Sequence, residues 1–445
     1  MKRSHTPLWS GLAFVATLLL LAGAATASTI TVPNGASGGT CGTSNPNRYE
    51  FGGSCGSLVS ITDTNPAYVQ DNSPAAEGTY RVRFYANFDG KGAAKQPSAP
   101  PFVTEPVVDL SMASGNAFDF FVAYDGADPA PPAAGGNAII RVELSQSSAT
   151  TRTIKFAARL NNGNEATFSR SLIGKALRGW RAIEINWAKA STPSGSNGVL
   201  QAWVDGVQVG NLTNLANGNQ VVNMVRWGAV AGIDSGTSGT FKLDDFVSQR
   251  SGYIGPALLY SDVPASGWSF PYVLSNAANE IIPGCGGGNF CPFTPVLRKD
   301  MAVYMLRSYE GTGYVPPACS SAPFDDIPTS HPYCAWINEL KNRGVVQGCT
   351  ATSYCPDYPV DREQMVKFIL STANPGVTPP ACSTAPFTDI PASRWSCPWV
   401  QMALAAGLTN GCTATQFCPT YPTDKEQETK FTTIGFGLPQ HAVGP

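Results

Sequence analysis

The sequence predicts a multidomain chain, in which an all-β sandwich is followed by an all-α module of three repeats. Two observations support this prediction. Between residues 60 and 255, many short segments alternate apolar and polar side chains, as half-buried β-strands do. Between residues 256 and 438, one unit recurs three times in register, with a period of 63 to 64 residues.

The first 27 residues have the features of a secretory signal peptide. Lys2 and Arg3 precede an apolar run from Leu12 to Ala22, and an Ala-Thr-Ala sequence ends at Ala27. An uncleaved anchor helix is the alternative interpretation. No later run approaches the roughly 20 apolar residues of a bilayer span. We therefore expect a secreted protein that has no membrane span after residues 1–27 are removed.

The charge balance argues against a nucleic-acid partner. The formal net charge is −2, and lysine and arginine do not cluster. Charged residues make up only 13% of the chain, which has 45 glycines and 36 prolines. This composition favours a loop-rich, β-heavy secreted protein.

All 12 cysteines follow the signal sequence, and an even number in an exported chain indicates disulfides. Zinc is the competing interpretation, but no pair has the C-x₂-C spacing of a zinc site. The expected pairs are Cys41–Cys55, Cys285–Cys291, Cys319–Cys334, Cys349–Cys355, Cys382–Cys397 and Cys412–Cys418.

Residues 28–60 are expected to form a short segment closed by the first of these bridges, and residues 61–255 to form the sandwich. The clearest strand is Tyr80–Phe88, in which apolar and polar residues alternate strictly over nine positions. The Asp205-Gly206 step predicts a tight hairpin between two apolar runs. No useful helical periodicity appears in this region, so a sandwich or a barrel is expected.

Three stretches of this domain carry recognisable motifs, namely 179–187 (GWRAIEINW), 198–206 (GVLQAWVDG) and 239–246 (GTFKLDDF). They resemble the concanavalin-A-like, laminin-G-like jelly roll. That superfamily contains lectins, glycosidases, lyases and adhesive modules, so the resemblance leaves the activity open. It also implies a structural calcium ion near Asp244 or Asp245, for which a solvated strand end is the alternative. No other cofactor is expected.

Catalytic residues are not expected in the sandwich. A retaining glycosidase places two carboxyl groups about 5 Å apart, whereas the acidic strand positions here are isolated. The domain also contains no histidine, which argues against Ser-His-Asp chemistry and histidine-based metal sites. Carboxylates from different strands could still meet in space. The isolated acidic residues are Asp119, Glu143, Glu184 and Asp205.

Tryptophans offer a different function, because their flat faces can stack on sugar rings. Trp187, Trp203 and Trp227 are the candidate surface positions, and packing in the core is the alternative. Trp180 and Trp187 are an odd number of residues apart, so a regular strand places them on opposite faces.

Each repeat predicts a helix, a loop closed by two cysteines and a second helix, over residues 256–312, 313–376 and 377–438. The copies open with an Asp-(Val/Ile)-Pro sequence, and their second helices begin at 297–300 (LRKD), 361–364 (DREQ) and 424–427 (DKEQ). Asp361 is a good N-cap. This pattern resembles S-layer homology repeats, three of which form a helical prism.

The resemblance implies a glycan site. S-layer homology modules use the basic residue at the start of the second helix to hold pyruvylated polysaccharide in the grooves between repeats, where a helix N-terminus already favours an anion. A helix-start ion pair is the alternative. The implied glycan-binding residues are Arg298, Arg362, Lys425, Trp336, Trp399, Asp262, Asp326 and Asp389.

The third repeat departs most from the pattern. Glu428 replaces a methionine, and Thr432, Thr433, Gly435 and Gly437 predict a disrupted second helix. This copy is expected to act as a cap.

Together these features predict a secreted cell-envelope protein. Its repeats would attach non-covalently to a cell-wall or surface polysaccharide, and its jelly roll would present a carbohydrate-binding or adhesive surface. One alternative is a polysaccharide hydrolase or lyase anchored in the same way. Another is a structural protein whose repeats bind other proteins.

Overall fold

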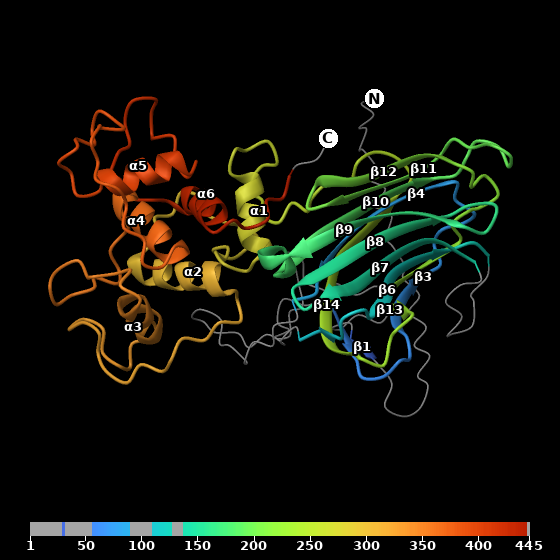
Figure 1. Ribbon diagram of the computed structural model, residues 1–445, viewed down its shortest axis with the longest axis horizontal. Coiled ribbons are helices and arrows are strands. Elements are labelled where there is room, and N and C mark those ends of the chain that lie inside the picture. Colours follow the sequence, from blue (N-terminus) through green and yellow to red (C-terminus); the bar gives the residue numbers. More distant parts are fainter. Residues whose placement is uncertain (1–28, 32–55, 90–108, 127–136, 443–445) are drawn as a thin grey trace, which may run out of the picture.

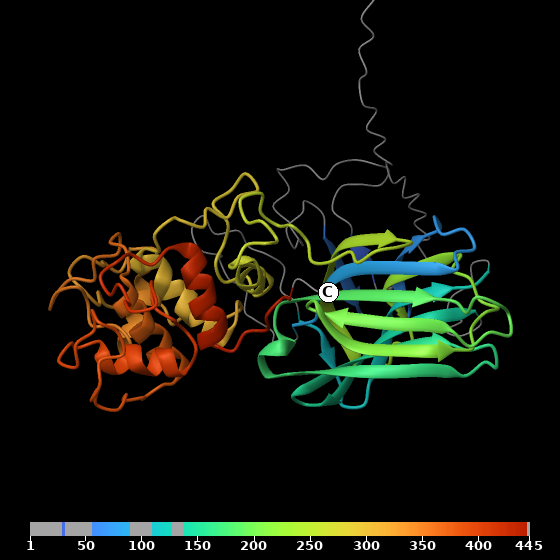
Figure 2. The ribbon, with the colours of Figure 1, turned by 90° about the horizontal axis from the view of Figure 1, so that it is seen from above.

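The computed structural model describes residues 29–31, 56–89, 109–126 and 137–442. The signal sequence and the expected Cys41–Cys55 bridge lie outside these residues. A β-sandwich forms one end of the molecule and six α-helices form the other (Figures 1 and 2). Of these helices, α1 lies nearest the sandwich. The predicted order, an all-β domain and then an all-α module, is confirmed.

The larger sheet of the sandwich has eight strands in the order β1-β2-β14-β4-β10-β11-β12, and β5 pairs with β14. All the pairings in this sheet are antiparallel. Its strands are β1 (Thr29–Thr31), β2 (Ser57–Ile61), β4 (Thr79–Asn87), β5 (Ser111–Met112), β10 (Trp180–Ala188), β11 (Gly198–Val204), β12 (Val207–Leu215) and β14 (Thr237–Gln249). Because β2 lies inside the sheet, the sandwich begins before the predicted boundary at residue 61.

The smaller sheet has six antiparallel strands in the order β3-β13-β6-β7-β8-β9. They are β3 (Ala67–Asp71), β6 (Ala117–Tyr124), β7 (Ala138–Ser148), β8 (Thr151–Arg159), β9 (Glu165–Ile173) and β13 (Met224–Ala231). Strand β9 was not predicted, because it is an edge strand with mostly exposed residues and little apolar alternation. A single core of aromatic and branched side chains fills the space between the two sheets.

The helical module is a closed ring of three helix pairs. Its helices are α1 (Phe270–Ala278), α2 (Arg298–Glu310), α3 (Cys334–Asn342), α4 (Arg362–Ala373), α5 (Cys397–Ala405) and α6 (Lys425–Gly435). Three backbone hydrogen bonds close the ring. Val296 donates to the carbonyl of Thr423 at 2.9 Å, Thr423 donates to Val360 at 2.8 Å, and Val360 donates to Val296 at 2.9 Å. Each repeat is thereby bonded to both of the others.

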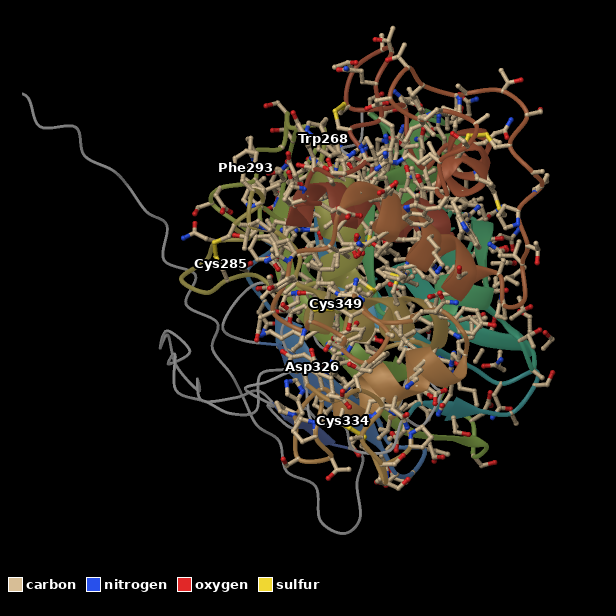
Figure 3. All side chains as sticks on the ribbon, turned by 90° about the vertical axis from the view of Figure 1, so that its left-hand side faces the viewer. Trp268, Cys285, Phe293, Asp326, Cys334 and Cys349 are labelled. Atoms are coloured by element: carbon tan, nitrogen blue, oxygen red, sulfur yellow. A yellow bond between two sulfur atoms is a disulfide. The ribbon has the colours of Figure 1, made fainter. Side chains whose placement is uncertain are left out.

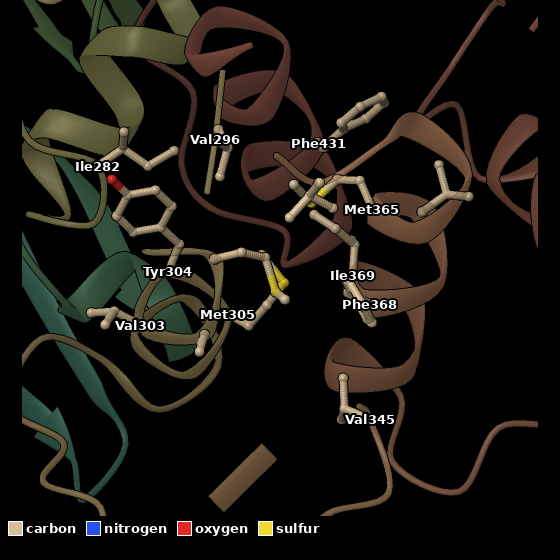
Figure 4. Close-up of a cluster of buried hydrophobic side chains, with 14 of the residues drawn as sticks. Ile282, Val296, Val303, Tyr304, Met305, Val345, Met365, Phe368, Ile369 and Phe431 are labelled. Atoms are coloured by element: carbon tan, nitrogen blue, oxygen red, sulfur yellow. The ribbon is translucent and has the colours of Figure 1, made fainter. Parts of the chain in front are cut away.

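One hydrophobic core serves all three repeats. Met305 of the first repeat, Met365 and Ile369 of the second and Phe431 of the third belong to the same buried cluster, which Figure 4 shows in close-up. Because this core is shared, the stability of one repeat depends on the presence of the others.

Five disulfides staple the outer loops, with the pairing that the sequence predicts: Cys285–Cys291, Cys319–Cys334, Cys349–Cys355, Cys382–Cys397 and Cys412–Cys418. The six-residue bridge occurs in every repeat, and the longer one only in the second and third. In the first repeat Phe270, which is 2% exposed, stands where the others have Cys334 and Cys397.

The prediction of a disrupted last helix is wrong. Helix α6 runs from Lys425 to Gly435, and its threonines face a polar partner. The hydroxyl of Thr432 donates to the Asn276 side-chain oxygen at 2.8 Å, and the Asn276 amide donates to the hydroxyl of Thr433 at 3.0 Å. These buried bonds with α1 stabilise the helix although its residues have low helix propensity.

Helix α1 packs directly against the sandwich. Trp180 is 1% exposed and lies in a small cluster with Tyr85, Ala182 and Ala278. Its indole N–H donates to Glu280 at 3.1 Å. Gly179 has φ +69°, and a Cβ atom there would lie 2.3 Å from the carbonyl oxygen of Ala278, so only glycine fits this contact.

The linker between the domains, which includes residues 253–257, is hydrogen-bonded to the sandwich. The carboxylate of Glu184, which is 3% exposed, accepts the backbone N–H groups of Ile254 and Gly255, each at 3.0 Å. The Tyr85 hydroxyl accepts the N–H of Ala257 at 2.9 Å. The outer face of β4 and β10, predicted to be solvated, is therefore largely covered by the linker and α1.

The C-terminal segment returns from α6 to the sandwich. The N–H of Ala442 donates to the carbonyl of Asp205 at 2.8 Å. His441 is 1% exposed, and its Nε2 atom lies 3.6 Å from Asp205. Burial lowers the pKa of His441 to about 4; the charge of Asp205 opposes this shift and that of Arg181 adds to it, both to a smaller extent.

Stability should therefore fall in mild acid. The unfolded chain takes up a proton on His441 near pH 6.5, whereas the folded protein does so only near pH 4. The contribution of neutral His441 to the free energy of unfolding is complete above pH 6.5. Up to about 3 kcal/mol of it is lost as the pH falls to 4. Melting temperatures of the wild type and His441→Leu, measured from pH 4 to 8, test this. The wild-type value should drop more steeply below pH 6.5, and parallel curves would contradict the assignment.

Candidate functional site

Three equivalent junctions join the repeats, and each consists of the start of one second helix and the next repeat in the ring. Junction 1 joins the start of α2 to repeat 2, junction 2 joins the start of α4 to repeat 3, and junction 3 joins the start of α6 to repeat 1. The predicted basic residues Arg298, Arg362 and Lys425 are the first residues of these helices.

The first two N–H groups of each second helix are already bonded at every junction. At junction 1, Arg298 and Lys299 donate to the carbonyls of Tyr358 and Pro356, each at 3.0 Å. Equivalent bonds join Arg362 to Tyr421 and Glu363 to Pro419 at junction 2, and Lys425 to Thr294 and Glu426 to Pro292 at junction 3. At α4 and α6, Asp361 and Asp424 cap the third N–H group, as the sequence predicts for Asp361.

The basic side chains are buried inside the junctions. Arg298, Arg362 and Lys425 are 3%, 6% and 8% exposed. The Nε atoms of Arg298 and Arg362 donate to the carbonyls of Tyr354 and Phe417 at 2.7 and 2.9 Å. Lys425 donates in the same way to Phe290 at 2.6 Å. Each side chain therefore fastens one repeat to the next.

The aspartates that open the repeats complete this arrangement from the other side. Asp326 accepts the N–H groups of Tyr354 and Cys355 at 2.8 and 2.7 Å. In the same way, Asp262 accepts the N–H groups of Phe290 and Cys291, and Asp389 accepts those of Phe417 and Cys418. The aromatic residue ahead of each cysteine is thus held through both its N–H and its carbonyl.

This geometry changes the predicted anion site. The first two N–H groups of each second helix and the basic side chains donate to carbonyls, so an acidic sugar could reach these groups only if a junction opened. Burial lowers the pKa of Lys425 to about 8 and also lowers the pKa of Arg298 and Arg362. Direct contact between these residues and a glycan stays a prediction.

The predicted tryptophans of the repeats are not equivalent in exposure. Trp336 is 5% exposed, beside Tyr314 and beneath the guanidinium of Arg307. Trp399 is half-buried against the core. Trp336 is therefore closed off from solvent, and Trp399 is only partly exposed.

The exposed aromatic side chains in the described residues lie elsewhere, and sequence reasoning missed them. They are Trp268, Phe293, Tyr358, Trp395 and Tyr421, which are 52%, 76%, 66%, 51% and 65% exposed. All five lie at the junctions. Superposing the three copies in register would have found Trp268 and Trp395, which occupy the same place just before the first helix.

The three tryptophans predicted at the surface of the sandwich are not exposed, which corrects that prediction. Trp187 is 0% exposed in the core between the sheets. Trp227 packs against Phe84 and Phe246 on the core side. Trp203 points outward, but Tyr253 of the linker and Arg81 cover it. Alternation placed Trp180 and Trp187 on opposite faces correctly, yet α1 buries the outer one.

Carboxylates from different strands do meet on the smaller sheet. Arg141 of β7 binds Asp119 of β6 at 2.9 Å and Glu165 of β9 at 2.9 Å. Glu143 lies 3.5 Å from Arg141 and 3.1 Å from Lys155. Burial raises the pKa of Asp119, and Arg141 opposes that shift. The group is an ion-pair network that the sequence did not show, because its members lie on separate strands.

The calcium expectation has little geometric support. Asp245 pairs with Arg83 at 3.0 Å, and Asp244 is 3% exposed. Across the described ranges, no cluster of three or more histidine, cysteine, aspartate or glutamate residues is arranged to hold a metal. The side chains of Asp244 and Asp245, as the structure places them, therefore do not fit a calcium site. Among these same residues, none of the helices has the length and apolar character of a membrane span.

Comparison with known proteins supports an assignment for the repeats. The S-layer homology domain family matches residues 259–302 and 323–366. An endoglucanase of Bacillus sp. (strain KSM-635) is 30% identical over 113 residues, which is 24% of this chain and 11% of that protein. The chain thus spans about a tenth of the length of this relative.

The sandwich has only remote structural likenesses. Endo-β-1,4-glucuronan lyase from the fungus Trichoderma reesei aligns with 45% of this chain and 82% of its own, at 14% identity and a TM-score of 0.30. The ligand-binding domain of botulinum neurotoxin serotype D, in complex with N-acetylneuraminic acid, aligns with 51% of this chain and 43% of its own, at 10% identity and a TM-score of 0.26. These scores are too low to carry an argument.

The family match and the fold together give the assignment. The chain contains S-layer homology domains at residues 259–302 and 323–366, and they follow an N-terminal β-sandwich.

Proposed function

We propose that this protein is a secreted cell-envelope protein that attaches non-covalently to a cell-wall or surface polysaccharide through its helical module. S-layer homology domains indicate cell-surface anchoring, and this match is the observation that carries the proposal. The closed ring adds support, because its three junctions hold exposed aromatic residues in a rigid frame. In this function the sandwich is presented outward as a carbohydrate-binding or adhesive domain.

The basic residues have an indirect part in this proposal. Arg298, Arg362 and Lys425 keep the junctions closed, so that the side chains around them are held in fixed positions. The glycan itself then contacts side chains at the surface of the helical module.

Sedimentation of the full-length mature protein with isolated envelope polysaccharide tests the anchor. The protein should pellet with untreated cell walls and stay in the supernatant with walls from which the polysaccharide has been chemically removed. The intact chain is needed, because a cut at Tyr253 would expose Trp180 and the other side chains that α1 covers. Equal retention on both preparations, or on neither, would contradict the proposal.

A second candidate is a polysaccharide hydrolase, and the network around Arg141 favours it. Asp119, Glu143 and Glu165 bring three carboxylates together on one face of the smaller sheet. If these groups are catalytic, the protein should release reducing ends from soluble glucans, and Glu143→Gln should abolish that release. If they are structural, no activity appears and Glu143→Gln only lowers the melting temperature.

A further inference from the structure

The exposed aromatic residues of the helical module are paired at two of the three junctions. At junction 3, the carboxylate of Glu426 accepts the hydroxyl of Ser269 at 2.9 Å, and its N–H donates to the carbonyl of Pro292 at 3.0 Å. Trp268 precedes Ser269 and Phe293 follows Pro292, so both aromatic residues lie beside the same glutamate. Figure 3 shows them on one part of the end face of the molecule.

Junction 2 repeats this arrangement with different side chains. Glu363 accepts the hydroxyl of Ser396 at 2.5 Å, and Trp395 is the residue before that serine. The carbonyl of Tyr421 accepts the N–H of Arg362 at 3.0 Å, which fixes the second aromatic residue beside the same helix start. Arg394 pairs with Glu363 through two bonds of 2.7 and 2.9 Å.

Junction 1 lacks the pair. Pro332 stands in place of the tryptophan, so Tyr358 is its only exposed aromatic side chain. Lys299 replaces the glutamate and binds Asp357 at 2.5 Å. The hydroxyl of Tyr333, next to the proline, donates to Asp300 at 3.1 Å.

The charges of junctions 2 and 3 select against an acidic ligand. At junction 3 the half-buried charged group is the carboxylate of Glu426, whereas Lys425 is buried and bonded to two carbonyls, each at 2.6 Å. At junction 2 the positive charge of Arg394 is already matched by Glu363. A sugar acid would meet a like charge at one site and a neutralised pair at the other.

Aromatic faces beside hydrogen-bonding groups suit an uncharged sugar. The C–H face of a pyranose packs on an indole or phenyl ring, and its hydroxyls can donate to a carboxylate. We infer that junctions 2 and 3 bind a neutral, hydroxyl-rich polysaccharide, with Trp268 and Phe293 as one stacking pair and Trp395 and Tyr421 as the other. This inference rests on the proposed anchoring function and names the chemical class of its ligand.

The test compares neutral and acidic polysaccharides. Envelope polysaccharide is separated by anion exchange into a neutral and an acidic fraction, with a soluble β-glucan and polygalacturonate as defined probes. The full-length protein should bind the neutral fraction with an affinity that changes little between 50 mM and 500 mM salt, because no ion pair is needed. Trp268→Ala and Trp395→Ala should each weaken that binding about tenfold, and the double variant should weaken it further.

Tyr358→Ala is the matched control, since it removes an equally exposed aromatic residue from junction 1. It should leave binding unchanged, and all these variants should keep the wild-type melting temperature. Binding to the acidic fraction alone, with strong salt dependence and no effect of the tryptophan changes, would overturn this inference and leave the anchoring function standing. Binding to neither fraction would overturn both. Equal losses in Tyr358→Ala would overturn the assignment to junctions 2 and 3.

Discussion

Replacement of Arg362 by alanine is expected to lower the free energy of unfolding of the helical module by about 3 kcal/mol. The guanidinium is buried and donates to the carbonyl of Phe417 at 2.9 Å and to the side-chain oxygen of Gln427 at 2.7 Å. Without it, a buried carbonyl and a half-buried amide oxygen lose a charged donor, and each such bond contributes about 1.5–3 kcal/mol. Denaturation in guanidinium chloride, followed by far-UV circular dichroism, measures the change.

Arg362→Lys is the control that the molecule itself suggests. Lys425 stands at the equivalent place in junction 3 and reaches the equivalent carbonyl, that of Phe290, at 2.6 Å. The lysine variant should therefore keep most of the stability that the alanine variant loses. If Arg362→Ala keeps the wild-type stability but loses polysaccharide binding, Arg362 contacts the glycan directly and the role assigned here is wrong.

Replacement of Glu428 by methionine should stabilise the module by about 2 kcal/mol at neutral pH. Glu428 is 0% exposed, and within the described part of the chain neither of its carboxylate oxygens has a hydrogen-bond partner. The equivalent residues of the other repeats are Met301 and Met365, both 0% exposed in the shared core. A methionine at this place would remove the unpartnered polar group and restore the apolar packing of its two counterparts.

The same residue should make stability depend on pH. Burial raises the pKa of Glu428 well above its usual value, so the folded protein holds the proton while the unfolded chain releases it. This contribution is complete below about pH 4.5, the usual pKa of the group, and is lost as the pH rises toward the folded pKa.

Unfolding curves at pH 4.5, 6 and 8 separate the two effects of Glu428. Glu428→Met should be more stable than the wild type, and this advantage should grow as the pH rises. Glu428→Gln should lose the part of the pH dependence that Glu428 causes but gain little stability, because the amide is still unpartnered. A wild-type protein that grows more stable from pH 4.5 to 8, by the same amount in all three chains, would contradict the assignment.

Much of the fold could be predicted because its signals are local. The strand predicted at Tyr80–Phe88 is present as β4, Thr79–Asn87, because its strict alternation is a local signal. The five bridges of the repeats follow from cysteines that recur in register. Strand β9 and helix α6 were misjudged, because partners remote in the chain stabilise them, namely β8 for the strand and Asn276 of α1 for the helix.

The candidate site was harder to predict, since the exposure of a side chain depends on tertiary contacts that local sequence patterns do not show. Trp187 and Trp268 are both tryptophans beside strand or turn signals, yet one is 0% and the other 52% exposed. The basic residue that starts each second helix is present in all three copies. Whether its charge faces solvent or a neighbouring carbonyl depends on how the repeats close into a ring.

By itself, the sequence determined that a β-sandwich precedes three disulfide-bonded helical repeats, two of which match the S-layer homology domain. Alternation, repeat period and cysteine spacing are properties of the chain that can be identified without knowing how it packs. Only the tertiary structure decided that Arg298, Arg362 and Lys425 act inside the junctions and that Trp268 and Trp395 lie outside. The physical reason is that ring closure joins residues 55 to 135 positions apart, and burial depends on those distant contacts.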